Sequence, residues 1–339
     1  MNKQTKNYRE KIMKFIRKVL PLIGLCIFIY LIYNIGINKI IDTFSQISII
    51  LIGLALFYHI PRVMLKTYQW QYLNKKQKIE VKSLTISKIF LIYLFYGAIT
   101  PGYIGTIIKV AYMKEATNEP LGKLFINNVI FTILSQFSLY LLFLFGIIMI
   151  SNRIPETLPI SITFILIMLA FCFYFYKKER GEKTLYFIVK LLMLKKLKNL
   201  FNKFIETFYM DFPNFKELIV TFIIGIPCWI IVYTQIYTIA LSFNINVPYL
   251  DFILFCAVCN VVALIPISIG GLGTREYTFI VLLEPYGVEA SVALVISLAG
   301  YLITDISLGI VGIIVALFES RNKKNNKFKM KSFMKNIDF

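Results

Sequence analysis

Long apolar runs separated by short basic segments dominate the chain. Six runs have about the 20 residues that a helix needs to cross the roughly 30 Å hydrocarbon core of a bilayer. These runs are 19–37, 47–65, 124–150, 159–176, 218–243 and 292–318. The pattern predicts an all-α polytopic membrane protein with about six full spans.

Two further apolar regions, 84–113 and 250–283, are interrupted near the middle by Pro and Gly. A helix made from either half would be only about 20–25 Å long, too short to span a bilayer. Backbone opened by Pro or Gly survives at membrane depth only when it is buried in protein or lines a watery cavity. We therefore expect two re-entrant helical hairpins, with two short full crossings at each place as the alternative.

The distribution of basic residues predicts the orientation. Lys and Arg are concentrated in 1–18, 66–88, 177–203 and 319–339, whereas the loops on the opposite side carry few. Cytoplasmic loops carry such an excess of Lys and Arg. Six spans with both termini cytoplasmic satisfy this rule at every loop, and we expect a multi-pass protein of the cell (plasma) membrane.

The expected organisation is a single membrane domain between two basic ends. The domain contains two repeats joined by an amphipathic basic connector, which we expect to lie on the cytoplasmic membrane surface. The parts are the basic N-terminus 1–18, the membrane domain 19–318, repeat A 47–150, the connector 177–217, repeat B 218–318 and the basic tail 319–339.

The two interruptions share the pattern P-x-x-I-G, and a cation follows each one. In the predicted topology the hairpins enter from opposite sides, so the two repeats would be inverted copies. Many secondary transporters have this architecture, with the substrate site where broken helices meet at the midplane. The matching residues are Pro101, Gly105 and Lys109 in repeat A, and Pro266, Gly270 and Arg275 in repeat B.

The chemistry of these segments favours an anionic ligand. A helix that restarts after a break points free N–H groups and a positive dipole end at the break. Glycines permit close backbone approach, and Lys109 and Arg275 add formal charge. The alternative is that the glycines serve packing and the cations extend to the interface. The candidate substrate-binding residues are Pro101, Gly102, Gly105, Lys109, Pro266, Ser268, Gly270, Gly271, Gly273, Arg275, Glu276 and Asp305.

Asp305 is included because it lies near the middle of the last span, where an unpaired charge costs at least about 2.5–3.5 kcal/mol. It shares one helical face with Tyr301, which should point inward. Arg275 and Lys109 are the ion-pair partners considered, and carrying a proton is a further alternative.

The segment Leu264–Leu283 resembles the signature of the flippase-like, lysylphosphatidylglycerol-synthase transmembrane family, P-x-S-x-G-G-x-G-x-R-E. The first hairpin resembles the P-G-x-x-G segment of that family, and Lys66–Trp70 resembles its basic stretch after the second span. The resemblance implies movement of an anionic phospholipid or a lipid-linked intermediate between leaflets. Two charged features of the family, an acidic residue with Arg after the first hairpin and an Arg in the last span, have no counterpart here. The fused aminoacyltransferase domain of longer members is also absent.

Composition excludes several other classes of protein. Hydrophobic residues make up 58% of the chain, above the 45–50% of soluble proteins. The net charge of +19 is divided among segments between apolar runs, which argues against nucleic-acid binding. His59 is the sole histidine and no G-x-x-x-x-G-K-[ST] loop is present, so we expect no metal, cofactor or bound ATP.

These observations favour a flippase-like lipid transporter whose head-group site lies between the hairpins. A membrane enzyme of lipid modification and a non-transporting scaffold subunit are the alternatives. The expected partners are anionic membrane lipids, with a homo-oligomer or a lipid-synthesising enzyme as further candidates.

Overall fold

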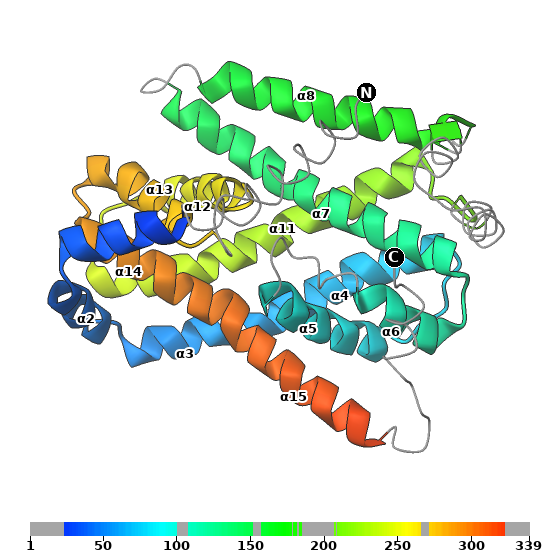
Figure 1. Cartoon of the computed structure of the whole chain (residues 1–339), viewed down its shortest axis with the longest axis horizontal. Helices are drawn as coiled ribbons and strands as arrows, with labels where there is room; N and C mark the ends of the chain where they lie inside the picture. The colour runs from blue at the N-terminus through cyan, green and yellow to red at the C-terminus, as the bar shows by residue number, and fades with distance from the viewer. Residues whose placement is uncertain are drawn as a thin grey trace, which may run out of the picture.

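The computed structural model describes residues 24–99, 108–151, 157–177, 179–181, 183–184, 207, 209–265 and 271–322. All regular elements in these ranges are helices, as the sequence predicts. Figure 1 shows them as a bundle of crossing helices, with α8 (Thr157–Tyr176) at its edge beside α7 (Leu121–Ile150). Most of the connector 177–217, both basic ends and both hairpin tips lie outside the described residues.

Four helices in the described part of the chain are long and apolar enough to cross a membrane. A fifth is added if the helices Gly24–Ile35 and Ile37–Ser45 (α2), which meet at 83°, form one bent span. The four are Ile49–Lys76, Leu121–Ile150, Phe215–Phe243 and Ala290–Phe318. The protein is therefore a multi-pass helical membrane protein, and the count of six spans stays a prediction.

The long helices consist of several consecutive elements. The first joins α3 (Ile49–Phe57) to α4 (His59–Lys76), and the third joins α11 (Phe215–Ala240) to a 3-10 turn. The last joins α14 (Ala290–Tyr301) to α15 (Ser307–Asn322) through a π-helical segment, Leu302–Ile306. Single π-turns inside α-helices are frequent at functional sites.

The second span extends beyond its predicted end at residue 65. The helix continues to Lys76, so Lys66 is inside a membrane-capable helix and not in a basic loop. Its C-terminal half carries buried polar residues that hydrogen-bond to neighbouring helices: Trp70 Nε1 donates to Asn127 on α7, and Gln69 donates to the Thr221 carbonyl on α11. Polar residues that are satisfied between helices lower the local hydropathy without ending the helix.

Each interrupted region consists of two short helices that pack together. In the first, α5 (Ser83–Ile99) contacts α6 (Ile108–Thr117). In the second, α12 (Tyr249–Ala263) contacts α13 (Thr274–Leu283). The longest, α5, has 17 residues and is about 25 Å long. The re-entrant course of these hairpins stays a prediction.

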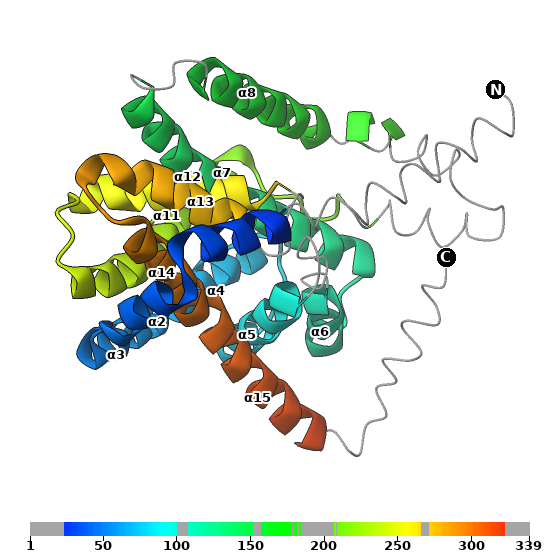
Figure 2. The ribbon, with the colours of Figure 1, turned by 60° about the vertical axis from the view of Figure 1, so that its left-hand side comes forward.

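The two halves pack onto each other reciprocally. Helix α5 of the first hairpin packs on α15, the end of repeat B, while α12 of the second hairpin packs on α7, the end of repeat A. Helices α4 and α11, which belong to the span that opens each repeat, also contact each other. Both views show α5 beside α15, and α4 and α11 near the centre of the bundle (Figures 1 and 2).

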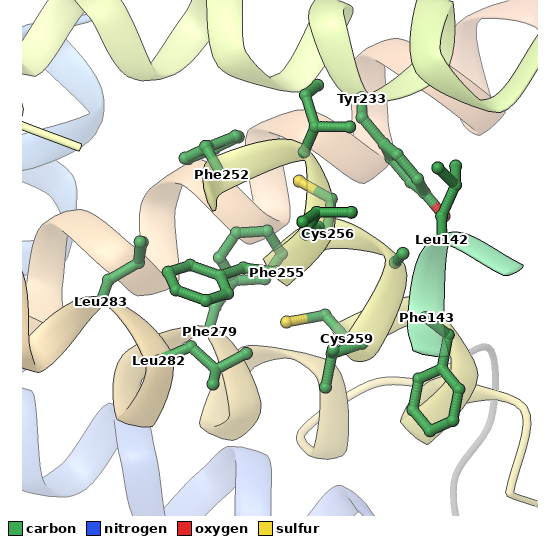
Figure 3. Close-up of a cluster of buried hydrophobic side chains, with 14 of the residues drawn as sticks. Leu142, Phe143, Tyr233, Phe252, Phe255, Cys256, Cys259, Phe279, Leu282 and Leu283 are labelled. Carbon is green, nitrogen blue, oxygen red and sulfur yellow. The ribbon is translucent and has the colours of Figure 1, made fainter. Parts of the chain in front are cut away.

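The largest apolar core surrounds the second hairpin. Figure 3 shows Phe252, Phe255, Cys256 and Cys259 of α12 among side chains of α7, α11 and α13. Both cysteines are at most 2% exposed and lie among apolar side chains. They behave here as small buried apolar residues. This core fixes α13, the helix that carries Arg275, against the rest of the protein.

Candidate functional site

Arg275 lies in the first turn of α13 and is bound to its neighbour Glu276. Its Nη2 and Nε donate to Glu276 Oε1 at 2.7 and 3.2 Å, and Nε also donates to Ser297 Oγ on α14 at 3.0 Å. The guanidinium lies 4.5 Å from the centre of the Tyr301 ring. Glu276 Oε2 accepts from the backbone N–H of Gly273, which caps the helix. The positive charge of Arg275 is thus offset within the protein.

Gly271 and Gly273, which precede α13, have backbone angles and close neighbours that a side chain would not permit. Their φ angles of +78° and +86° lie in the region that L residues rarely adopt. A Cβ on Gly273 would lie 2.1 Å from the Gly24 carbonyl oxygen, and one on Gly271 would lie 2.4 Å from Ala263 Cβ. Both described glycines of the signature therefore approach other parts of this chain.

Lys109 holds the corresponding place in the first hairpin, but no described carboxylate pairs with it. It is the second residue of α6, as Arg275 is of α13, and both donate to a hydroxyl on the helix that follows their hairpin. The acceptor for Lys109 is Thr132 Oγ1 on α7, 3.2 Å away. Lys109 is 2% exposed. Where Glu276 follows Arg275, an apolar Val110 follows Lys109.

Aromatic rings take the place of a counterion around Lys109. Its Nζ lies 4.6 Å from the centre of the Tyr93 ring, 5.0 Å from that of Phe131 and 5.6 Å from that of Trp70. Cation–π contacts at such distances are worth about 0.5–1 kcal/mol each, and more when desolvated. Such contacts stabilise the ammonium form of Lys109 relative to an apolar pocket without rings.

Lys66 joins the same group from helix α4. Its Nζ lies 5.6 Å from the centre of the Phe131 ring and 5.8 Å from that of Trp229. It donates to Gln69 Oε1 at 3.0 Å and to Ser135 Oγ on α7 at 3.1 Å. The two lysine side chains share the Phe131 ring. We call this group the two-lysine site: Lys66, Lys109, Trp70, Tyr93, Phe131 and Trp229.

Asp305 pairs with Arg62, and not with Arg275 or Lys109 as considered from the sequence. Arg62 Nη2 donates to Asp305 Oδ1 at 3.2 Å, and Nη1 donates to the Thr304 carbonyl in the π-helical segment. The Thr304 carbonyl belongs to the π-helical segment of the last span, so Arg62 contacts this span through a side chain and through the backbone. His59, on the same helix as Arg62, hydrogen-bonds to Ser307 and so connects α4 to α15.

Of the predicted site residues, Lys109, Gly271, Gly273, Arg275, Glu276 and Asp305 are described. Pro101, Gly102, Gly105, Pro266, Ser268 and Gly270 lie outside the described residues. The structure places Arg275 with Glu276, and Asp305 with the unpredicted Arg62. Arg62, Lys66 and Trp70 recur every four residues on one face of α4, a spacing that could have revealed them as a buried functional face.

The buried charges do not balance. The cations Arg62, Lys66, Lys109 and Arg275 lie among the helices, and in the described part of the chain Asp305 and Glu276 pair with only two of them. Neither Lys66 nor Lys109 forms an ion pair with another described residue. The two-lysine site therefore carries an excess of positive charge.

An apolar cavity of about 580 Å³ lies between α7, α8 and α11. Neighbouring residues of α7 face opposite sides. Ile130 and Leu134 line the cavity, whereas Phe131 and Ser135 contact Lys66. The cavity is lined almost entirely by carbon, with Phe173 of α8 and Phe222 of α11 on its other sides. Helix α7 thus faces the two lysines on one side and the apolar cavity on the other.

Among the described residues, no group of three or more His, Cys, Asp or Glu side chains could hold a metal ion. The fold and these buried charges define a multi-pass helical membrane protein with paired and unpaired ionic groups between its spans.

A family model described as the lysylphosphatidylglycerol synthase TM region matches residues 19–312, so the chain belongs to this family. It is also similar to two archaeal proteins. It is 26% identical to UPF0104 membrane protein MJ1078 of Methanocaldococcus jannaschii over 251 residues, 69% of this chain and all of that protein. It is 24% identical to UPF0104 membrane protein PH1989 of Pyrococcus horikoshii over 308 residues, 84% of this chain and 92% of that protein.

Proposed function

We propose that this protein moves an anionic lipid between the leaflets of the cell membrane, with both of its termini in the cytoplasm. The observation that carries the proposal is that Lys66 and Lys109 lie between the helices without an ion-pair partner among the described residues. A charge at membrane depth costs several kcal/mol unless something neutralises it, and such residues mark substrate pathways. An anionic head group supplies that neutralisation.

The arrangement of the helices supports transport more than catalysis. The reciprocal packing of α5 on α15 and of α12 on α7 is the pattern expected of two inverted copies. Lys109 and Arg275 occupy matching places in the two hairpins, and each donates to a hydroxyl on the next span. In this proposal Lys109 contacts the head group. Arg275, with its charge offset by Glu276, positions the second hairpin.

The cavity beside α7 supports a lipid as the substrate. A lipid needs both a polar place for its head group and an apolar place for its acyl chains. Helix α7 offers one on each face, through Thr132 and Ser135 on one side and Ile130 and Leu134 on the other. We propose that an acyl chain of the transported lipid occupies this cavity.

The family description names a synthase of a phosphatidylglycerol derivative, which makes anionic glycerophospholipids the first class to test. Lipid-linked polyprenyl phosphates are the second class. The sequence has no ATP-binding loop of the G-x-x-x-x-G-K-[ST] type.

Leaflet exchange of fluorescent lipids in proteoliposomes tests the proposal. The purified full chain is compared with protein-free liposomes for phosphatidylglycerol, phosphatidic acid, a polyprenyl phosphate and zwitterionic phosphatidylcholine. We expect at least one anionic lipid to exchange about tenfold faster than phosphatidylcholine. Protein-free rates for all four lipids, with protein shown to be folded, would contradict the proposal and favour an enzyme or scaffold.

A further inference from the structure

In the described part of the chain the two-lysine site has two basic groups and no carboxylate bound to them, which constrains the charge of its ligand. We propose that it binds a lipid phosphate monoester, whose head group carries two negative charges, in preference to a phosphate diester, which carries one. This inference rests on the proposed function, because it takes the ligand to be a lipid. A phosphate monoester has about −1.5 to −2 charge at pH 7, and two neighbouring ammonium groups favour the fully ionised form.

The hydrogen-bonding capacity of the two lysines also fits a monoester. An ammonium group has three donors. Lys66 uses two of them, on Gln69 and Ser135, and Lys109 uses one, on Thr132. Counting only bonds within the described ranges, one donor remains on Lys66 and two remain on Lys109. A phosphate monoester presents three terminal oxygens, so every remaining donor has an acceptor.

The aromatic rings define the character of the site. Phe131 and Trp70 are at most 2% exposed and keep water from one side of the ammonium groups. In such a low-dielectric environment the attraction between ammonium and phosphate is stronger than in water. Thr132 is exposed, and Tyr93 and Trp229 are partly exposed. In this proposal the head group approaches the two lysines along that side.

The two buried arginines, Arg275 and Arg62, are weaker candidates for binding this phosphate, because each is already bound to a carboxylate. Arg275 donates two hydrogen bonds to Glu276 and one to Ser297, and Arg62 is bound to Asp305 and the Thr304 carbonyl. A phosphate at either arginine would have to displace, or lie beside, a carboxylate. We therefore place the phosphate at Lys66 and Lys109, where no described carboxylate would have to be displaced.

The chain has two tryptophans, Trp70 and Trp229, and both contribute rings to the two-lysine site. Intrinsic tryptophan fluorescence of the full chain in detergent therefore reports on this site. The probes are phosphatidic acid and phosphatidylglycerol with identical acyl chains, and glycerol 3-phosphate as a soluble monoester. We expect saturable fluorescence changes, with phosphatidic acid binding at least tenfold more tightly than phosphatidylglycerol.

Two variants remove one charge each from different helices, so the test survives if either fails to fold. Lys66→Met and Lys109→Met should each weaken phosphatidic acid binding about tenfold or more, the loss expected for one charged hydrogen-bonding partner. Lys75→Met is the matched control, because Lys75 is an exposed lysine on the same helix as Lys66. It should bind phosphatidic acid like the wild type.

Equal affinities for phosphatidic acid and phosphatidylglycerol would overturn the proposal, as would unchanged affinity in both Lys→Met variants. Glycerol 3-phosphate binding as tightly as phosphatidic acid would overturn the assignment to a lipid. Tight binding of phosphatidic acid through both lysines, without any leaflet exchange, would refute the proposed transport and leave this site in place. The two proposals therefore fail by different results.

Discussion

Removing the carboxylate of Glu276 should be one of the most damaging single changes in this protein. The residue is fully buried, and its Oε1 accepts two hydrogen bonds from Arg275 and one from Ser297. Glu276→Gln keeps the shape but leaves the guanidinium buried without a counterion. Breaking a buried pair in this way costs about 3–5 kcal/mol. The Tyr301 ring and the Ser297 hydroxyl still contact Arg275, so we expect the lower end of that range.

The thermal unfolding midpoint in detergent at a fixed heating rate measures this effect. At roughly 2 °C per kcal/mol, Glu276→Gln should lower the midpoint by roughly 6 °C or more. The double variant Arg275→Met/Glu276→Gln removes both charges and should recover most of that loss, because no buried charge is then left without its partner. An unchanged midpoint in Glu276→Gln, or a double variant as unstable as the single one, would refute the reasoning.

Two further predictions concern packing and pH. Gly273→Ala should lower the thermal unfolding midpoint by several degrees, because the new Cβ would lie 2.1 Å from the Gly24 carbonyl oxygen and the φ of +86° adds strain. A midpoint equal to that of the wild type would show that the two segments do not pack this closely. In a loop outside the spans, hydrogen bonds from Lys78 and then Lys123 lower the pKa of Asp211. A lowered carboxyl pKa contributes stability above the unfolded pKa of about 3.9, and that stability is lost as pH falls through the lower folded pKa. Asp211→Asn should therefore cost about 1 kcal/mol at pH 7 and nothing well below pH 3, as unfolding midpoints across that range would show; an equal cost at every pH would contradict the ionic origin.

The apolar pattern predicted most of the helices, because lipid-facing and buried positions both select apolar residues. The predicted spans 124–150, 218–243 and 292–318 fall within long helices, and both interrupted regions contain two short helices. The predicted first span is different. After Gly36, with φ of 90°, the chain turns by 83° into α2, and hydropathy does not register such a turn.

The partners of the buried charges were beyond the reach of the sequence. Arg62 and Asp305 are separated by 243 residues, and their contact depends on a π-turn that no composition rule predicts. Lys66 was counted as a loop charge because the neighbouring residues on α4 are polar. Those side chains instead bond to α7 and α11, so polarity marked an interior face and not the end of a span.

The inward face of the last span was predicted correctly, since spacing along one helix is a local property. Tyr301 stacks on Arg275, Asp305 faces Arg62, and a Cβ on Gly312 would meet the Leu91 carbonyl of α5 at 2.1 Å. Whether the proposed lipid contacts this face is a separate question from its packing.

The central claim is that two unpaired lysines bind the head group of a transported anionic lipid. The most direct test is the leaflet-exchange rate of phosphatidic acid in proteoliposomes made with the wild type, with Lys66→Met/Lys109→Met and with the exposed control Lys75→Met. We expect Lys75→Met to exchange phosphatidic acid at the wild-type rate and Lys66→Met/Lys109→Met to show only the protein-free rate. Exchange by the folded double variant at the wild-type rate would contradict the claim.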